Sequence, residues 1–348
     1  MQVAFVVKPM KPIAVYGATG HTGRFVVQEL GRRGRISRAV GRDRAMLHAL
    51  DASEVRVATI DDSVALADAF RGTSVIINCA GPFLDTAAPV IRAAMEAGVH
   101  YLDVTAEQQS VRDTFADFDA IARAKRLCVV PGAGFFGGLA DLLASTALGD
   151  WTRAERATIA VFLYSWRPTS GTRLTGTRNH YPRVVLRDGE LFPVAGTMAD
   201  EDWDFGAPHG RVPVVPVPLS EIITIARHGK IDRIDSLMNA SALADLSDAN
   251  EQGPQASGDR GRSAQRFVMD VRIENVGTFR RATAIGQDIY AVTAPLVVEP
   301  ALRIVDDRVA VSGGCVTLSH LGNASCFLAA MVDAYSGFAF STVTDPPG

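Results

Sequence analysis

Three glycines at a fixed spacing follow a short apolar run near the start of the chain. Ile13–Tyr16 is predicted to be a strand, and Gly17-Ala-Thr-Gly20-His-Thr-Gly23 comes directly after it and opens a helical pattern. Gly17 allows a tight turn, Gly20 lets a ligand approach the backbone without meeting a Cβ, and Gly23 lets the helix pack closely on the strand. A strand, a glycine triplet and a helix in this order predict the first unit of a doubly wound parallel sheet.

The start of that helix is suited to bind a diphosphate. The N–H groups of a first helical turn have no intrahelical acceptor, and the helix dipole is positive there. The hydroxyls of Thr19 and Thr22 can add hydrogen bonds. The alternative is a structural turn that binds no ligand. We expect the cofactor-binding residues of this segment to be Gly17, Thr19, Gly20, His21, Thr22 and Gly23.

The end of the second strand distinguishes between the two nicotinamide dinucleotides. A site for NAD usually places Asp or Glu there, where the carboxylate binds the ribose 2′-hydroxyl. Here the predicted strand Ser37–Gly41 is followed by Arg42, whose guanidinium can bind a 2′-phosphate in a bidentate fashion. Asp43 comes one residue later than an NAD site requires. We therefore predict NADP(H) as the cofactor; the alternative for Arg42 is a solvated turn residue.

Apolar strand-like runs alternate with helical periodicity through the first 150 residues. This alternation predicts an α/β fold with a Rossmann-type doubly wound parallel sheet. The ligand of such a sheet lies across the carboxyl ends of the strands, where the strand order reverses. The strands that we expect after Ile13–Tyr16 are Ser37–Gly41, Arg56–Thr59, Val75–Asn78, Tyr101–Val104 and Leu127–Val130.

After Gly149 the pattern changes to longer strands and hairpins. This change predicts a second α+β domain that contains a mixed or antiparallel sheet. We place the NADP-binding domain at residues 1–150, the substrate or dimerisation domain at 151–310, and a C-terminal helical segment that returns to the first domain at 311–348. Ala195–Pro218 and Ala244–Ser263 are expected to be long loops. The expected elements are strands at Ala157–Trp166, Arg266–Glu274 and Arg280–Ile285, a hairpin within Val184–Val194 and a helix at Ala291–Val305.

The composition argues against several classes of protein. The chain has 348 residues and a formal net charge of −3, whereas a nucleic-acid binder usually has a basic excess. No apolar run approaches the roughly 20 residues that span a bilayer, so we expect no membrane partner and a cytoplasmic location. The four cysteines have no Cys-x-x-Cys spacing, which favours free thiols over disulfides or a metal site.

Three further segments follow in an order that resembles a known family. They are Asn78-Cys-Ala-Gly-Pro-Phe83, Tyr101-Leu-Asp103-Val-Thr-Ala-Glu107 and Pro131-Gly-Ala-Gly-Phe-Phe-Gly-Gly-Leu-Ala-Asp141. Together with the glycine triplet, they resemble the NADP-binding domain of the saccharopine dehydrogenase-like oxidoreductases, including the members called trans-acting enoyl reductases. The resemblance is strong over residues 12–145 and patchy over residues 160–340. Ala106 departs from the glycine that several members have before the glutamate.

The resemblance implies NADPH, a cleft between two domains and hydride transfer to or from a small molecule. The chain has no Tyr-x-x-x-Lys pair, which argues against the proton relay of short-chain dehydrogenases. We predict an NADPH-dependent reductase that acts on a C=C, C=N or C=O bond. The alternative is a non-catalytic NADP(H)-binding sensor, which would fill the space beside the nicotinamide with apolar side chains.

The strand ends of the first domain supply further candidate residues. Ala80, Gly81 and Pro82 are expected to pass beside the cofactor. Tyr101, Asp103 and Glu107 follow at the end of the fifth strand, where a hydroxyl and two carboxylates can act as a general acid or anchor the substrate. The alternative is that they cap the next helix and hold its loop.

The second domain has a crowded run of arginines near Ser170-Gly171-Thr172, which we expect to be a flexible loop that reaches the cleft. Arg173 can hold a carboxylate or phosphate, so an anionic small-molecule substrate is one interpretation and a solvated strand face is the other. Tyr181 is a candidate proton donor. Trp203 and Phe205 either cover an apolar ligand or hold their own loop. The sheet of this domain is also where a homodimer would form.

Overall fold

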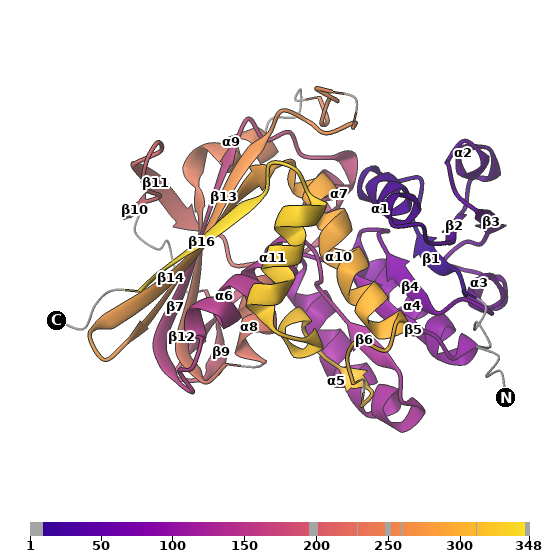
Figure 1. Ribbon diagram of the computed structural model, residues 1–348, viewed down its shortest axis with the longest axis horizontal. Coiled ribbons are helices and arrows are strands. Elements are labelled where there is room, and N and C mark those ends of the chain that lie inside the picture. The colour runs from indigo at the N-terminus through magenta and orange to yellow at the C-terminus, as the bar shows by residue number, and fades with distance from the viewer. Residues whose placement is uncertain are drawn as a thin grey trace, which may run out of the picture.

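The computed structural model describes residues 10–194, 201–227, 229–247, 252–258, 260–310 and 312–344. Two sheets lie on opposite sides of the molecule, and a group of helices that includes α6, α10 and α11 lies between them (Figure 1). The fold class predicted from the sequence is confirmed, since one sheet is parallel and Rossmann-like and the other is mixed.

The parallel sheet has the strand order β15-β6-β5-β4-β1-β2-β3. The order reverses between β1 and β4, so a crevice opens above the carboxyl ends of these two strands. Residues near the C-terminus add the outer strand β15, which pairs with β6 in parallel. The strands are β1 (Ile13–Tyr16), β2 (Ser37–Gly41), β3 (Glu54–Val57), β4 (Val75–Asn78), β5 (His100–Asp103), β6 (Cys128–Val130) and β15 (Gly314–Cys315).

Helices cover both faces of the parallel sheet. One face is covered by a row of three helices, α3 (Ser63–Phe70), α4 (Phe83–Ala97) and α5 (Gln108–Lys125). On the other face, α1 (His21–Arg32) packs against α10 (Ile289–Val305), which also contacts β4 and β5. The short α2 (Arg44–His48) joins β2 to β3. A helix that follows β14 of the second sheet in the chain therefore completes the helical layer on this face of the first sheet.

The second sheet has the order β10-β11-β12-β7-β13-β14-β16, and a hairpin of β8 and β9 pairs with β12. The pairing of β12 with β7 is parallel and the others are antiparallel, so the sheet is mixed. The strands are β7 (Ala154–Tyr164), β8 (Val184–Arg187), β9 (Glu190–Pro193), β10 (Glu201–Asp204), β11 (Arg211–Pro216), β12 (Ile231–Asn239), β13 (Arg266–Asn275), β14 (Thr278–Gln287) and β16 (Ala339–Thr344).

The remaining helices pack between the sheets or at the edge of the crevice. The helix α6 packs on β13, β14 and β7 and against α11, and buried apolar side chains of both sheets join in one core. The elements are the π-helical turn η1 (Phe135–Leu139), α6 (Ala140–Leu148), α7 (Ser170–Arg178), α8 (Ser220–Ala226), α9 (Ala240–Ser247), the 3₁₀ turn η2 (Leu318–Leu321) and α11 (Ala324–Ala334).

Two expectations about loops were wrong. Ser170-Gly171-Thr172 does not form a flexible loop but begins the helix α7, because the Thr169 side chain accepts a hydrogen bond from Thr172 N and caps the helix. The expected long loop at 195–218 contains the antiparallel pair of β10 and β11, of which residues 195–200 lie outside the described residues. The loop expected at 244–263 overlaps the end of α9, and its residues 248–251 and 259 are likewise outside the description.

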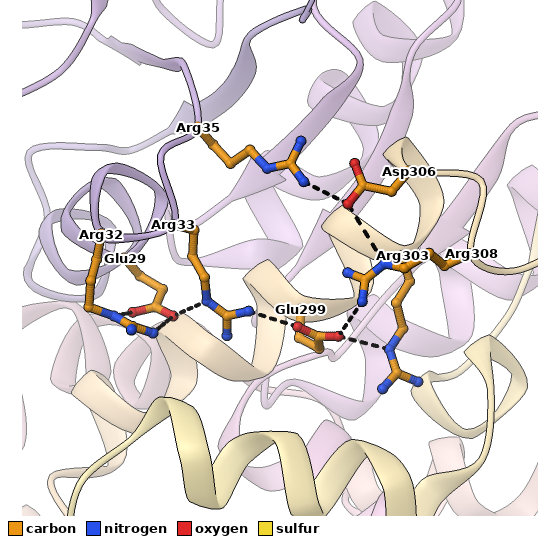
Figure 2. A network of polar contacts seen from close by, with 8 residues as sticks. All are labelled: Glu29, Arg32, Arg33, Arg35, Glu299, Arg303, Asp306 and Arg308. Atoms are coloured by element: carbon orange, nitrogen blue, oxygen red, sulfur yellow. Dashed lines mark hydrogen bonds and ion pairs between the residues drawn. The ribbon is translucent and has the colours of Figure 1, made fainter.

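Ion pairs hold α10 against the phosphate-loop helix α1 (Figure 2). The buried carboxylate of Glu299 on α10 contacts Arg33 of α1, at 2.9 Å, and Arg303 of its own helix, at 3.0 Å. Glu29 of α1 contacts Arg33 from the opposite side at 2.8 Å. Through this network the C-terminal half of α10 is fixed to the C-terminal end of α1.

Neither membrane spans nor disulfides are found in the part of the chain that the structure describes. Its helices are all too short or too polar to cross a bilayer. Its four cysteines are free thiols, of which Cys128 and Cys315 are buried.

Candidate functional site

A cleft of about 730 Å³ lies at the carboxyl ends of β1, β2 and β4. Cavities of a few hundred to about 1,000 Å³ are typical of small-molecule sites. One wall is made by the segments that follow the strands of the first sheet. The opposite wall is made by Trp166, α7 and the first turn of α10. The cleft therefore lies between the two parts of the fold, where the resemblance placed it.

The glycine triplet forms a tight turn whose backbone faces the cleft. Gly17 has a φ of +74°, and a Cβ there would lie 2.8 Å from Ala80. At Gly23 a Cβ would lie 2.2 Å from the carbonyl oxygen of Gly17, so only glycine lets α1 approach the strand this closely. Gly17, Thr19, Gly20, His21 and Thr22 line the cleft, whereas Gly23 acts through packing.

His21 provides an unusual polar atom in this wall. Its Nε2 atom is buried and has no hydrogen-bond partner among the residues that the structure describes. Its ring packs edge-on against Phe25 and Tyr290, with centroids 5.3 Å apart in both cases. Burial lowers the pKa of His21, so the ring is neutral near pH 7. An unsatisfied buried nitrogen beside the phosphate loop is available to a ligand of the cleft.

The residues at the end of β2 and after β3 line one part of the cleft. Arg42 lines the cleft together with Thr59 and Asp61, which follow β3. Asp43 does not line it; its carboxylate accepts a hydrogen bond from Met46 N at 3.0 Å and caps α2. The carboxylate that directly follows Arg42 in sequence is therefore used to cap the helix, whereas Arg42 and Asp61 both line the cleft.

The segment after β4 forms the floor of the cleft. Ala80, Gly81 and Pro82 all line it. The side chain of Asn78 accepts a hydrogen bond from Ala80 N at 3.0 Å, and Thr86 donates to the carbonyl oxygen of Ala80 at 2.5 Å. These two bonds fix the backbone just before the turn, so that the floor is rigid.

Tyr101 and Asp103 lie behind the floor rather than in the cleft. Both side chains are fully buried and neither lines the cavity. The Tyr101 hydroxyl donates to Asp103 Oδ2 at 2.9 Å, and Asp103 Oδ1 accepts from Thr105 N and Gly132 N at 3.0 and 2.8 Å. Burial raises the pKa of Asp103 to about 6, which would suit a general acid, but the carboxyl cannot reach a substrate. These residues instead tie the loops after β5 and β6 together.

Glu107 lines the cleft but its carboxylate is occupied. It accepts hydrogen bonds from Phe83 N at 2.7 Å and from Leu84 N at 3.1 Å, the first two N–H groups of α4. Burial raises its pKa, and these two bonds lower it in part. Glu107 therefore caps the preceding helix α4, whereas the structural alternative in the sequence had it cap the next helix, α5.

The second-domain residues expected in the site lie elsewhere. Arg173 donates to the carbonyl oxygens of Leu246 and Asp245, at 2.8 and 3.4 Å, and does not line the cleft. Tyr181 is 53% exposed and is also absent from the lining. Thr172 and Leu174 line the cavity but Arg173 between them does not, because it lies on another face of α7.

Other second-domain side chains expected near a ligand are engaged in polar contacts, Arg178 with α4 of the first domain and the others within their own sheet. Arg178 pairs with Asp85 at 2.8 Å and Arg187 pairs with Asp235 at 2.5 Å. Trp203 donates to Asp270 Oδ2 at 2.7 Å, so the strand β10 is fixed to β13 rather than folded over a ligand.

The wall opposite the floor contains residues that the sequence did not single out as chemistry. Three hydroxyls, those of Thr169, Thr172 and Tyr290, meet there with the indole N–H of Trp166. We call these four residues the hydroxyl cluster, and all four line the cleft. Tyr290 lies within residues 160–340, where the family resemblance is patchy, and that partial resemblance was the signal that could have pointed to it.

The charges of the lining are unevenly distributed. Arg42 is the one Lys or Arg side chain among the described residues of the lining, and it lies at the end of β2. The part between the floor and the hydroxyl cluster is apolar or hydroxyl-bearing, with Phe135, Phe136 and Leu174 as its largest apolar side chains. The carboxylates of the whole lining are Asp61, which follows β3, and Asp85 and Glu107, which bind Arg178 and the first N–H groups of α4.

Comparisons with known proteins agree with this geometry. Residues 13–130 match the family model of the saccharopine dehydrogenase NADP binding domain. The chain is 30% identical over 152 residues to the human "Saccharopine dehydrogenase-like oxidoreductase", a match that covers 37% of this chain and 35% of the human protein. It is 28% identical over 146 residues to the "Lipid droplet localized protein" of Caenorhabditis elegans, covering 37% and 34% of the two chains. The chain thus matches about a third of the length of these relatives.

A solved structure extends the similarity in fold to the second domain. The apo, histidine-tagged saccharopine dehydrogenase (L-Glu forming) from Saccharomyces cerevisiae aligns with a TM-score of 0.68 over 96% of this chain and 100% of that chain. The sequences are 13% identical over this alignment, so the likeness concerns the fold of both domains and not their chemistry.

Proposed function

Since residues 13–130 form a saccharopine dehydrogenase NADP-binding domain, we propose that the chain is an NADPH-dependent reductase of a small organic molecule. The observation that supports this most directly is the cleft itself. It begins at the phosphate loop and continues past the ends of β4 and β5 to a wall of hydroxyl and aromatic side chains. NADPH, when bound, supplies the hydride for a C=C, C=N or C=O bond.

The residues of the first domain fit the cofactor. The amides of residues 21–23 and the turn at Gly17 offer a cradle that a Cβ would fill, and the free Nε2 of His21 offers one more hydrogen bond. Arg42 would bind the 2′-phosphate, because two parallel N–H···O bonds match its geometry. Ala80, Gly81 and Pro82 would lie along the nicotinamide ribose.

The charges of the cleft support an uncharged acceptor rather than the anionic one that the arginine-rich stretch suggested. A buried carboxylate or phosphate needs a cationic partner, since an unpaired charge is expensive to desolvate. The described lining offers one cation, Arg42 at the adenosine end, and three carboxylates, those of Asp61, Asp85 and Glu107. An aromatic or aliphatic ketone, enone or imine would bury its apolar part against Phe135, Phe136 and Leu174.

A screen of NADPH consumption tests this function. Purified protein would be incubated with NADPH and matched pairs of acceptors, for example cinnamaldehyde and cinnamate, at 340 nm. We expect oxidation of NADPH with uncharged members and at least tenfold lower kcat/KM with their anionic partners. NADH should be a poor substitute.

The same screen tests the sensor alternative. Tight binding of NADPH in calorimetry, together with no consumption by any enone, ketone or imine, would favour a sensor over a reductase. Lack of affinity for either dinucleotide would remove both functions.

A further inference from the structure

The hydroxyl cluster has a hydrogen-bond pattern that fixes where its protons point. Tyr290 Oη lies 3.1 Å from Thr169 N, 3.3 Å from Trp166 Nε1 and 3.0 Å from Thr172 Oγ1. The Oγ1 atoms of Thr169 and Thr172 are 3.0 Å apart, and Thr172 N donates to Thr169 Oγ1 at 3.1 Å. Three of the donors in this cluster, the amides of Thr169 and Thr172 and the indole of Trp166, can only donate.

Counting lone pairs gives the direction of each bond. A phenol oxygen accepts two hydrogen bonds, and the N–H groups of Thr169 and Trp166 use both, so the Tyr290 hydroxyl must donate to Thr172. Thr172 then has its own proton free to donate to Thr169. Thr169 Oγ1 already accepts from Thr172 N and from the Thr172 hydroxyl, so its proton has no acceptor within the cluster. Since Thr169 lines the cleft, this last proton is available to a bound molecule.

Tyr290 is held firmly at the first position of this series of hydrogen bonds, which ends at Thr169. Asp288 caps α10, and its carboxylate accepts from Tyr290 N and Ala291 N at 3.0 and 3.1 Å. The ring of His21 packs edge-on against the Tyr290 ring, which connects the cluster to the phosphate loop. Burial raises the pKa of Tyr290, and the bonds with Thr172, Thr169 N and Trp166 partly oppose this. The phenol therefore keeps its proton at neutral pH.

The helix α7 brings Thr169, the last residue of this series of hydrogen bonds, close to the floor of the cleft. Thr169, Thr172 and Thr175 recur every three residues along it, and all three line the cleft. A Cβ on Gly81 would lie 3.3 Å from Thr175 Oγ1, so α7 lies directly over the turn expected beside the nicotinamide. The proton at Thr169 thus lies in the same space as the acceptor bond of the proposed reaction.

We propose that the hydrogen-bonded series Tyr290–Thr172–Thr169 delivers the proton that completes the reduction, a step that rests on the proposed reductase function. Hydride from NADPH adds to one atom of the acceptor bond and leaves an electron pair on the other atom. That atom takes the Thr169 proton, Thr169 takes the proton of Thr172, and Thr172 takes that of Tyr290. The phenolate is stabilised by the N–H groups of Trp166 and Thr169, and water in the emptied cleft returns its proton along the same chain.

Substitutions that keep the shape of the cluster test this proposal. Thr172→Val removes the middle hydroxyl, Thr172→Ser restores it, and Tyr290→Phe removes the proton source. A positioned general acid contributes about 100-fold or more to a rate. We expect kcat to fall by about 10- to 100-fold in T172V and Y290F and to stay within about threefold in T172S. The matched control is Thr177→Val, on the same helix, because its hydroxyl bonds to the carbonyl oxygen of Arg173 and lies outside the cleft.

A second readout needs no cofactor and no turnover. In protein labelled with ¹³Cζ-tyrosine, the Tyr290 signal is the one missing from Y290F. Its shift should move in T172V, where the phenol loses its acceptor, and remain in place in T172S and T177V. Calorimetric Kd values for NADPH should agree within about twofold among all variants, which separates proton delivery from cofactor binding.

The outcomes separate the two proposals. If wild-type protein reduces an acceptor while T172V and Y290F keep its kcat, proton delivery is wrong and the reductase function stands. An unmoved Tyr290 signal in T172V also contradicts the proposed order of hydrogen bonds. If the wild type reduces no acceptor despite binding NADPH, the reductase function fails and proton delivery fails with it.

Discussion

Arg33 at the end of α1 and Glu299 of α10 form an ion pair between the phosphate-loop helix and a helix some 260 residues later in the chain, with 2.9 Å between Nη1 and Oε2 (Figure 2). Only 5% of the Glu299 side chain is exposed, and Arg303 and Arg308 approach the same carboxylate at 3.0 and 3.3 Å. Burial alone would raise the pKa of Glu299, but the bonds from Arg303 and Arg33 lower it below its usual range. The carboxylate is thus ionised in the fold and stabilises three neighbouring cations.

Replacing Glu299 by Gln should weaken the fold measurably. Hydrogen bonds to charged groups contribute about 1.5–3 kcal/mol each and a buried ion left unpaired costs more, so we expect E299Q to lower the free energy of unfolding by about 2–4 kcal/mol at pH 7. Because the folded pKa is lowered, this contribution is present above the unfolded pKa and is lost as the pH falls below about 4.5.

Urea unfolding of both proteins between pH 3 and 7 measures this difference. The control is Asp232→Asn, which breaks an exposed pair with Arg153 and should cost at most about 1 kcal/mol. Equal effects of the two substitutions at pH 7 would show that burial adds nothing to the Glu299 pair.

Asp103 should give a pH dependence of the opposite sign. Burial raises its pKa from 3.8 to about 6, so the folded protein binds a proton that the unfolded chain has released. The stabilisation from this carboxyl is fully present below pH 3.8 and is lost as the pH rises through about 6. A rise of this size in the pKa of a buried carboxyl corresponds to about 3 kcal/mol.

The comparison of wild type with Asp103→Asn isolates this group, since the amide does not titrate. We expect the stability of wild type relative to D103N to fall by about 3 kcal/mol between pH 4 and 7, as measured by urea unfolding at each pH. A constant difference across this range would mean that Asp103 does not change its protonation between these pH values in the fold.

Local sequence patterns were sufficient for much of the fold. Strands such as Val75–Asn78 are short apolar runs bounded by turn residues, and their predicted bounds agree with the structure. The strand β12 (Ile231–Asn239) was missed because Asp232, Arg233 and Asp235 interrupt its apolar pattern. Asp235 finds its partners in Arg156 of β7 and Arg187 of β8 as well as in Arg233 of its own strand. Tertiary ion pairs of this kind leave no periodic signal in the sequence.

The two halves of the candidate site differ in how far sequence could predict them. The phosphate loop is continuous in the chain, so the spacing of Gly17, Gly20 and Gly23 was enough to define it. The hydroxyl cluster joins Trp166 and Thr169 to Tyr290, which are 124 and 121 residues apart, and depends on how α10 packs. Arg173 shows the reverse error, since its closeness in sequence to Thr172 did not place it in the cleft.

Arg42 should determine the choice between the two dinucleotides. Its loss in Arg42→Gln removes charge-assisted hydrogen bonds that we assign to the 2′-phosphate, which contribute about 1.5–3 kcal/mol. We expect the Kd for NADPH to rise about 10- to 100-fold and the Kd for NADH to change little. Arg44→Gln is the matched control, because Arg44 lies two residues on, is exposed and does not line the cleft. Equal losses for NADPH and NADH in R42Q would place the 2′-phosphate elsewhere.

Two glycines of α1 allow a test of the phosphate loop in which no polar or charged side chain is altered. A Cβ at Gly23 would lie 2.2 Å from the carbonyl oxygen of Gly17, so Gly23→Ala must push α1 away from the turn. Overpacking of this kind costs about 1–3 kcal/mol, and the displaced amides should raise the Kd for NADPH at least tenfold.

At Gly31, eight residues further along the same helix, a Cβ would meet nothing within 4 Å. Gly31→Ala should therefore stabilise the protein by about 0.5–1 kcal/mol, because alanine is the better helix former, and leave the Kd for NADPH unchanged. Thermal unfolding and calorimetry on the two variants measure both quantities. If G23A bound NADPH as tightly as G31A, the close contact of α1 with the turn would not be what presents the amides to the diphosphate.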